Sequence, residues 1–264
     1  MEQRLTNSKR RLGLIGFGAF GQLAAGALAR DFAIVAHDPN PAARMAMHRL
    51  AVTPAPLETV AASPIVVIAA PVSAFGQIAA AIAPHLPPGA LVCDVGSVKM
   101  APAAILDAAL PGHVRIVATH PLFGPQSARD GVAGRKIALC PLRGASARPV
   151  ERFLARRLGL DVIVTTPEQH DRELAVVQGL THLVARAITE LGPPQTRMTT
   201  LSYERLMEAV AMVRDDAPEV FAAIERDNPF AADVRAAFLD RLTVLSAANR
   251  DQRRAAGSDC AQSQ

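Results

Sequence analysis

The chain lacks tryptophan and has one tyrosine among its 264 residues, and aromatic residues make up only 4% of it. Its core therefore has to be built from aliphatic side chains, which are plentiful because half of the chain is apolar. The net charge is only +4, with neither a basic stripe nor basic residues interleaved with aromatic ones. These absences argue against nucleic acid as a partner.

Cysteine and long apolar runs are scarce as well. The three cysteines, Cys93, Cys140 and Cys260, show neither paired nor metal-ligand spacing, so we predict no metal site. Cys93 and Cys140 are expected to be small core residues, and the odd count favours a reducing compartment. No apolar run approaches the ~20 residues that span a bilayer, and the polar segment Met1–Arg11 is unlike a signal peptide. We therefore expect a cytoplasmic protein that has no membrane partner.

The first half of the chain alternates apolar runs with alanine-rich helical segments, which is typical of repeated βαβ units. The predicted strands are Leu12–Ile15, Ala33–Ala36, Ile65–Ala69, Leu91–Asp94, Arg115–Ala118, Lys136–Cys140 and Asp161–Thr165. The predicted helices are Gln22–Arg30, Ser73–Leu86, Met100–Leu110 and Ser146–Leu158. Strands that are apolar throughout predict a mostly parallel sheet that is buried on both faces.

Helical periodicity replaces the strands after Thr166. Pro167 fits the first turn of a long helix that should run to about Leu191, and no further strand is expected before about Asn249. We predict an α/β fold with a Rossmann-like NAD-binding domain over residues 1–166 and a helical domain for substrate binding and dimerisation over residues 167–250. The polar tail, residues 251–264, is expected to be flexible.

A glycine loop follows the first predicted strand and opens the first helix. The first glycine of the loop allows a tight turn, the second lets the backbone approach a pyrophosphate, and the third lets helix and strand pack closely. We assign to the cofactor the loop residues Gly16, Phe17, Gly18, Ala19, Phe20 and Gly21. The simpler reading is that these glycines only form a turn, but the strand–turn–helix context favours a dinucleotide.

Asp38 lies at the end of the second predicted strand, 22 residues after Gly16, where an acid would bind the hydroxyls of the adenosine ribose. A carboxylate there repels a 2′-phosphate and favours NAD. NADP stays open, because Arg44 could serve a phosphate. Ala70 and Pro71, which follow the third predicted strand, are also assigned to the cofactor site.

Two further segments carry candidate catalytic residues. Ser97 follows a predicted strand at the edge where such sheets bind ligands, although a serine there could equally cap the helix that follows it. His120 lies just after another apolar run and is followed by Pro121. A histidine can accept a hydroxyl proton at neutral pH while a hydride leaves the same carbon, which suggests an alcohol dehydrogenation.

Taken in order, the glycine loop, Asp94–Lys99, His120–Pro125 and the later stretches 168–172 and 178–182 resemble the prephenate/arogenate dehydrogenase family of tyrosine biosynthesis. The resemblance implies oxidative decarboxylation of a cyclohexadienol with hydride transfer to NAD. It implies that His120 takes the proton of the ring hydroxyl and that Ser97 orients His120 or that hydroxyl, so that both contact cofactor or substrate. It also implies a homodimer.

On a helical wheel, Asp171, Gln178 and His182 fall within about 40° of one another. In the family this stretch faces the substrate, so Gln178 and His182 are candidate substrate ligands, whereas Asp171 is expected to hold the domain junction. His170 and Arg172 point elsewhere on the wheel and are interpreted as structural or surface residues.

The loop after His120 bears on the choice of substrate. Gln126, Ser127 and Asp130 are assigned to substrate binding, and a carboxylate at Asp130 would favour the ammonium group of arogenate over prephenate. An Asp-Gly turn alone also explains Asp130. The ring carboxylate needs a cationic partner, and the sequence leaves five candidates open: Arg129, Lys136, Arg186, Arg197 and Arg205.

Two other functions are compatible with a dinucleotide domain joined to helices. A β-hydroxyacid dehydrogenase uses a lysine on the interdomain helix, and the segment Pro167–Leu191 has none. A redox-sensing NAD-binding regulator would have no use for His120 beside Ser97. Prephenate dehydrogenase activity, giving 4-hydroxyphenylpyruvate, is the alternative within the family.

Overall fold

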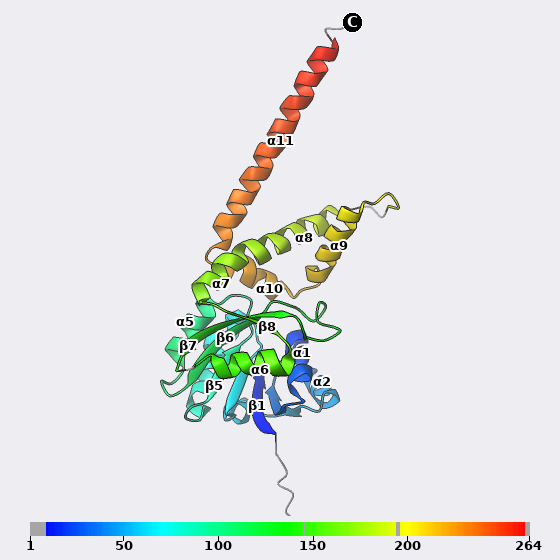
Figure 1. The fold of residues 1–264 in the computed structure, drawn as a ribbon. Helices are drawn as coiled ribbons and strands as arrows, with labels where there is room; N and C mark the ends of the chain where they lie inside the picture. Colours follow the sequence, from blue (N-terminus) through cyan, green and yellow to red (C-terminus); the bar gives the residue numbers. More distant parts are fainter. Residues whose placement is uncertain (1–8, 145, 194–195, 262–264) are drawn as a thin grey trace, which may run out of the picture.

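The structure, a computed structural model, describes residues 9–144, 146–193 and 196–261. Its centre is an eight-stranded sheet with the order β3-β2-β1-β4-β5-β6-β7-β8 (Figure 1). The strands are β1 Arg10–Ile15, β2 Phe32–His37, β3 Thr53–Pro54, β4 Ile65–Ile68, β5 Leu91–Asp94, β6 Arg115–Pro121, β7 Lys136–Arg143 and β8 Asp161–Val164. Every neighbouring pair is parallel except β6 and β7, so the predicted mostly parallel sheet is confirmed.

Helices cover both faces of the sheet. The helices of this part are α1 Ala19–Leu28, α2 Ala43–Arg49, α3 Leu57–Ala61, α4 Phe75–Ile82, α5 Met100–Ala109 and α6 Arg148–Leu158. One apolar core joins the sheet to α3, α4 and α5, and a second joins the opposite face to α1 and α2, with α6 packed against its edge. The cores are aliphatic with few aromatic residues, as the composition predicts. Burial raises the pKa of the Cys93 and Cys140 thiols to about 12, so both are inert core residues.

The short elements α2, β3 and α3 were not expected from the sequence. The strand β6 is also longer than predicted and continues to Pro121, so His120 lies within it, opposite Ala138 of β7. β1, β4, β5 and β6 run in the same direction, and their carboxyl ends meet at the edge of the sheet that faces the helical part of the chain (Figure 1).

The helical part begins with the expected long helix. Thr166 caps it, Pro167 stands in its first turn, and Gly192 ends it in the left-handed conformation. It is not uniform: α7 Pro167–Leu174 and α8 Leu180–Leu191 are joined by a π-helical turn, η3 Ala175–Gly179. A π turn holds more residues than an α turn, and it therefore changes the phase between the two halves of the helix.

The chain then forms α9 Leu201–Val213, α10 Pro218–Ala222, a second π-helical turn, η4 Ala223–Asp227, and α11 Ala231–Ala261. The helix α11 continues beyond residue 250, where the helical domain was expected to end, through the polar segment to Ala261, and it extends away from the rest of the molecule (Figure 1). Among the described residues, no helix combines the length and apolar character needed to cross a bilayer.

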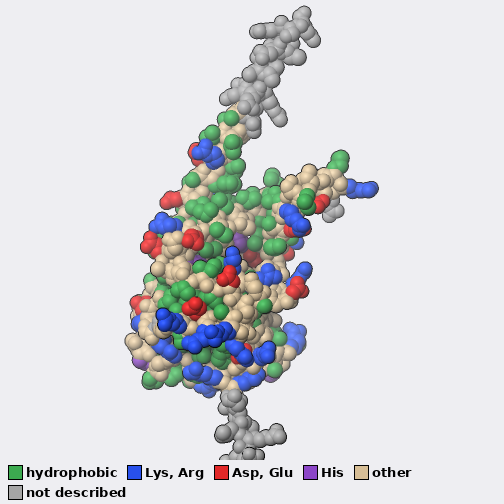
Figure 2. Space-filling model, viewed as in Figure 1, with side chains coloured by type: hydrophobic (Ala, Val, Ile, Leu, Met, Phe, Trp, Pro, Cys, Tyr) green, Lys and Arg blue, Asp and Glu red, His purple; other side chains and the backbone are tan. Residues whose placement is uncertain are grey.

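The surface is charged unevenly. Lys and Arg side chains gather on the side of the molecule that α6 covers (Figure 2). Arg148, Arg152, Arg156 and Arg157 of α6 are all exposed. The helix is therefore basic on its outer side and apolar on the side that faces the sheet.

Candidate active site

The glycine loop has the tight geometry that its sequence predicts. Gly16 has a φ of +93°, and a Cβ atom added there would lie 2.3 Å from the carbonyl oxygen of Ala69. Gly21 packs as closely, because a Cβ there would lie 2.4 Å from the carbonyl oxygen of Gly16. Gly18 differs: no atom lies within 4 Å of its added Cβ, and no side chain caps α1. The first turn of α1 therefore presents N–H groups that suit a phosphate group.

These contacts predict different outcomes for two alanine substitutions. Gly16→Ala is expected to lower the free energy of unfolding by more than about 1 kcal/mol, because the side chain meets backbone and φ is unfavourable. Gly18→Ala, with φ of −65° and open space, should change it by less than about 0.5 kcal/mol. Urea denaturation followed by circular dichroism measures both, and equal losses would contradict the assigned loop geometry.

Asp38 fixes the loop as well as facing it. Its Oδ2 accepts a hydrogen bond from the Phe17 N–H at 2.6 Å, and its Oδ1 accepts one from the Asn40 N–H at 2.8 Å. A carboxylate has about four acceptor positions, so capacity remains for the hydroxyls of a ribose. The residues Ala70 and Pro71 follow β4, next to the loop, since β1 and β4 pair up to Ile15 and Ile68.

His120 is the buried end of a chain of hydrogen bonds. The side chain is 4% exposed, and its Nδ1 lies 2.9 Å from Nε2 of His170. The Nδ1 of His170 lies 2.7 Å from Oδ1 of Asp171. Both partners come from α7, so the long helix sets the orientation of the histidine on β6. His170 is therefore a buried residue and not a surface one, and its contact with His120 was not predicted from the sequence.

This chain determines which ring nitrogen of His120 carries the proton. The Asp171 carboxylate only accepts hydrogen bonds, so His170 donates from Nδ1 and, when neutral, accepts at Nε2. His120 must then donate from its own Nδ1, which leaves the lone pair of His120 Nε2 free. This tautomer is the one that can accept a proton from a substrate hydroxyl.

The surroundings also keep His120 neutral. Burial holds the pKa of His120 well below its usual value, and the nearby cation of Lys99 lowers it further. Desolvation of a histidine disfavours its charged form, as does any nearby cation. His120 is therefore a base in its free form at neutral pH.

Asp171 joins the two parts of the chain, as predicted from the helical wheel. Besides His170 it accepts the N–H groups of Lys99 at 2.7 Å and Met100 at 2.8 Å, so it caps α5 from outside. Ser97 therefore does not cap this helix, which begins at Met100 with no cap from its own neighbourhood. The Ser97 side chain is half-buried and forms no hydrogen bond within the described part of the chain.

Asp94 and Lys99, at the end of β5 and before α5, form a fully buried ion pair. Lys99 Nζ contacts Asp94 Oδ2, and both side chains are 0% exposed. Lys99 Nζ also donates to the carbonyl oxygen of Thr119 at 2.7 Å, and Thr119 Oγ1 donates to the carbonyl oxygen of Asp94. These bonds fasten the ends of β5 and β6 together immediately before His120. The segment Asp94–Lys99 was singled out from the sequence, but this role of Lys99 was not predicted.

The loop after β6 is fastened to the end of α9. Ser127 Oγ bonds to the backbone of Gly124. Gln126, in the amide orientation that satisfies both of its atoms, donates to the carbonyl oxygens of Ala211 at 3.1 Å and Met212 at 2.8 Å. Gln126 and Ser127 therefore stabilise the conformation of the loop through these contacts. From the sequence, both residues were expected to bind the substrate.

His182 and Asp216 meet beside this loop. His182 Nε2 lies 3.2 Å from Asp216 Oδ2, and His182 Nδ1 lies 2.9 Å from the carbonyl oxygen of Gln178. His182 is 6% exposed. Gln178 is half-buried. Asp216 was not singled out from the sequence, because it lies in a short connection between helices.

Other assigned residues lie away from this cluster. The Asp130 side chain is 85% exposed and pairs with Arg129 at 3.6 Å. All five candidate partners for a ring carboxylate are exposed: Arg129, Lys136, Arg186, Arg197 and Arg205. Arg186 and Arg205 are also paired with glutamates on their own helices. The structure does not bring this set of cations to His120.

A mostly parallel sheet with a glycine loop at its carboxyl edge, joined to helices that orient a buried histidine, defines a two-domain protein of the dinucleotide-binding class. Comparison with known proteins gives the family. The nucleotide-binding domain of prephenate dehydrogenase matches residues 25–177, and the dimerisation domain of prephenate dehydrogenase matches residues 166–256. The chain belongs to the prephenate dehydrogenase family.

Individual relatives agree with this result. A probable arogenate/prephenate dehydrogenase of Methanocaldococcus jannaschii is 26% identical over 193 residues, covering 69% of this chain and 43% of the relative. Arogenate dehydrogenase 2 of Arabidopsis thaliana, a chloroplastic protein, is 31% identical over 149 residues, covering 54% and 42%. The matches thus span less than half the length of these curated relatives.

Solved structures show the same fold. Prephenate dehydrogenase from A. aeolicus, in complex with hydroxyphenyl propionate and NAD+, has a TM-score of 0.76 with this chain at 22% identity. The likeness covers 94% of this chain and 93% of that one. The predicted Rossmann-like domain followed by a helical domain is confirmed.

Proposed function

We propose that the protein catalyses the NAD-dependent oxidative decarboxylation of arogenate to tyrosine, with His120 as the base. The observation that carries the proposal is the orientation of His120, whose Nδ1 is bonded to His170 at 2.9 Å so that Nε2 is free. Prephenate, which would give 4-hydroxyphenylpyruvate, is the alternative substrate. The name of the M. jannaschii relative includes both substrates.

The residues present suit NAD. The open N-terminus of α1 at Gly18 has room for the pyrophosphate, and the Asp38 carboxylate suits ribose hydroxyls and disfavours a 2′-phosphate. When bound, NAD would supply the acceptor for the hydride that leaves the carbinol carbon of the substrate. His120 Nε2 takes the proton from the hydroxyl on that carbon. Ser97, with its side-chain hydroxyl free of other bonds in the described residues, orients the same hydroxyl.

The choice between arogenate and prephenate depends on a carboxylate near the substrate side chain, because such a group attracts an ammonium and repels a keto acid. The sequence suggests Asp130. The contacts favour Asp216 instead, since Asp216 pairs with the buried His182 and a Cβ added at Gly124 would lie 4.0 Å from its Oδ1. Asp216 also retains partial access, with its side chain 27% exposed.

The test is NADH formation by the purified chain with arogenate and, separately, prephenate, each with NAD and NADP. Faster turnover of arogenate with NAD supports the proposal. If neither substrate were turned over, the proposal would be wrong, and a redox sensor or a β-hydroxyacid dehydrogenase would be the remaining alternatives.

Two matched variants then locate the selector of the substrate. Asp216→Asn is expected to lower the preference of kcat/KM for arogenate over prephenate by about tenfold, the effect of one charged contact. Asp130→Asn should leave this ratio within twofold, roughly the scatter of a surface substitution. The reverse pattern would restore Asp130 as the selector and remove Asp216.

The role of His170 has its own prediction. His170→Leu removes the acceptor for the His120 N–H, so the imidazole can take either tautomer, and kcat should fall by about 10–100-fold. KM should change little, because His170 acts through His120. The measurement is the steady-state rate over a range of pH, with unfolding followed in parallel. His170→Asn, which can still accept from His120, is expected to recover part of the rate, and no difference between the two variants would contradict the role.

The helical part also supports a homodimer. Large apolar side chains are exposed along α8, α9 and α11, among them Leu191, Leu201 and Leu245. Exposed apolar surface of this kind marks an interaction site, and residues 166–256 match a dimerisation domain. Light scattering coupled to size-exclusion chromatography should give twice the mass of the chain, and a monomer at micromolar concentration would refute the proposal.

A further inference from the structure

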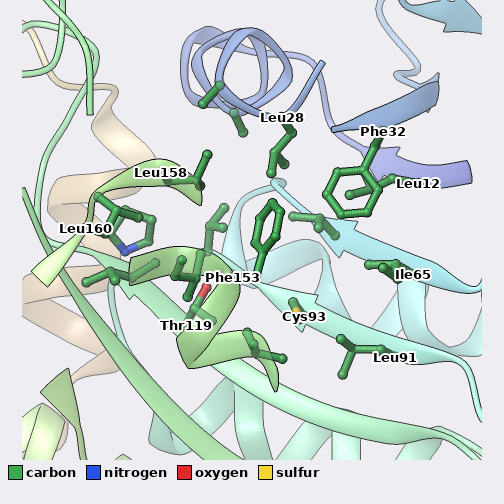
Figure 3. Close-up of a pocket in the computed structure, with 18 of the residues that line it drawn as sticks. Leu12, Leu28, Phe32, Ile65, Leu91, Cys93, Thr119, Phe153, Leu158 and Leu160 are labelled. Carbon is green, nitrogen blue, oxygen red and sulfur yellow. The ribbon is translucent and has the colours of Figure 1, made fainter. Parts of the chain in front are cut away.

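A cavity of about 320 Å³ lies between the sheet and α6 (Figure 3). Phe153 and Leu158 line it from α6, Leu28 lines it from α1, and Ile65, Leu91 and Cys93 line it from the strands. Its volume falls in the range of natural binding sites for small molecules, which is about 300–1,000 Å³. Of the residues assigned above to the cofactor or the substrate, Phe20 alone lines it.

The helix α6 is only loosely packed against the sheet. No residue of α6 is buried, although its apolar side chains face inward. Two contacts tie it across the strands: the rings of Phe153 and Phe32 meet edge-on with centroids 5.3 Å apart, and Arg157 pairs with Asp31. Protein interiors are normally close-packed. The apolar side chains that line this cavity therefore lack packing partners, and a bound ligand would supply them.

One end of the cavity is cationic. Arg10, the first residue of β1, and Arg115, the first residue of β6, both line it, whereas no Asp or Glu does. Arg115 Nε donates to the carbonyl oxygen of Gly89 at 3.0 Å, which fixes the guanidinium and leaves its other nitrogens available. Neither arginine has a carboxylate partner among the described residues. The lining thus combines an apolar body with two positive charges at one end.

The cavity and His120 lie on opposite faces of β6, although Phe20 of the glycine loop also lines the cavity. Successive side chains of a strand point to opposite faces of the sheet. Thr119 and Pro121 of β6 line the cavity, and His120 between them faces the other way, toward His170. A ligand in the cavity and a substrate at His120 would therefore occupy opposite faces of the same strand.

We propose that this cavity binds a small apolar monocarboxylate, with its apolar part between α1 and α6 and its carboxylate at Arg10 and Arg115. Burial of the apolar part supplies the affinity, and charge-assisted hydrogen bonds to the arginines supply the selectivity for an anion. The proposal is independent of the reaction catalysed at His120.

The test is calorimetric titration of the full chain with decanoate, with decanol and decylamine as neutral and cationic counterparts. Decanoate should bind, and the two counterparts should bind at least about tenfold more weakly, the effect of a hydrogen bond to a charged group. Equal binding of decanol, or no binding of decanoate, would overturn the proposal.

Variants show whether binding takes place in this cavity. Ala27→Phe places a ring in the cavity from α1 and should abolish decanoate binding while leaving Tm equal or higher, because it fills empty space. Ala24→Leu serves the same purpose if the larger side chain prevents folding. Arg115→Gln should weaken decanoate about tenfold, whereas Arg148→Gln, on the exposed side of α6, should change it by less than about twofold. Unchanged binding in Ala27→Phe and Ala24→Leu would overturn the proposal.

Discussion

Replacing His120 with asparagine is expected to lower kcat by about 10²–10⁴-fold, the usual contribution of a positioned general base. The asparagine amide can still donate to His170, so the chain of hydrogen bonds from Asp171 is kept, but no basic atom replaces Nε2. The affinity for NAD should remain within a few-fold, because the glycine loop and Asp38 lie on different strands from His120. Steady-state rates with arogenate, together with calorimetric titration of NAD, measure the two effects.

The control for this prediction is His113→Asn. His113 is exposed and bonds to the Leu86 carbonyl oxygen just before the start of β6, far from His120 near its other end, so turnover should stay close to that of the unmodified protein. Near-normal turnover by His120→Asn across pH would remove His120 from the chemistry, even if the reaction itself were confirmed.

The same histidine predicts the pH dependence. A base must be neutral to accept a proton, and the pKa of His120 lies well below its ordinary value because of burial and neighbouring positive charge. Activity should therefore persist as the pH falls through about 6.5, the pKa of an unperturbed histidine, and fall only at lower pH. Below about pH 6.5, His120 is protonated in the unfolded chain but stays neutral in the folded protein. Because the unfolded state then binds more protons, the free energy of unfolding should fall as the pH is lowered through this range. An acidic limb of kcat/KM above that pH would contradict the assignment.

Most of the fold and part of the site could be predicted from the sequence, because their signals are local. A few neighbouring residues are enough to predict the glycine loop, the apolar strands and the start of the long helix at Thr166-Pro167. His120 was also found locally, through its place after a strand. Its partner His170 was not, because the 50 residues between them carry no signal of their contact.

The helical wheel predicted the junction role of Asp171 but did not describe the whole of the long helix. It treats the segment from Asp171 to His182 as one regular α-helix, whereas the π turn η3 lies between these two residues and changes their phase. Asp171 consequently meets α5 and His170, and His182 meets Asp216. Asp130 shows that burial is also hard to predict from a local motif. The motif places a carboxylate in a loop, but the 85% exposure of the Asp130 side chain depends on how that loop packs.

Replacing Lys99 with methionine is expected to lower the free energy of unfolding by about 3–5 kcal/mol, the cost of breaking a buried ion pair from one side. The Asp94 carboxylate would stay buried with no cation, and its Oδ1 already has no hydrogen-bond partner in the described residues. The carbonyl oxygen of Thr119 would lose its donor as well, immediately before His120. Because a domain is stable by only about 5–15 kcal/mol, this single change should bring the protein close to unfolding.

The double variant Lys99→Met with Asp94→Asn separates charge from packing. Without the carboxylate no uncompensated charge is buried, and the asparagine amide can still accept the Gly96 N–H that Asp94 Oδ2 accepts at 2.9 Å. The double variant should therefore be more stable than Lys99→Met alone, since burying an unpaired charge costs more than losing a neutral hydrogen bond. Urea denaturation followed by circular dichroism gives both free energies. If the double variant were less stable than the single one, the buried charge would not be the source of the loss, and the Lys99 side chain would instead stabilise β5 and β6 through its bond to Thr119.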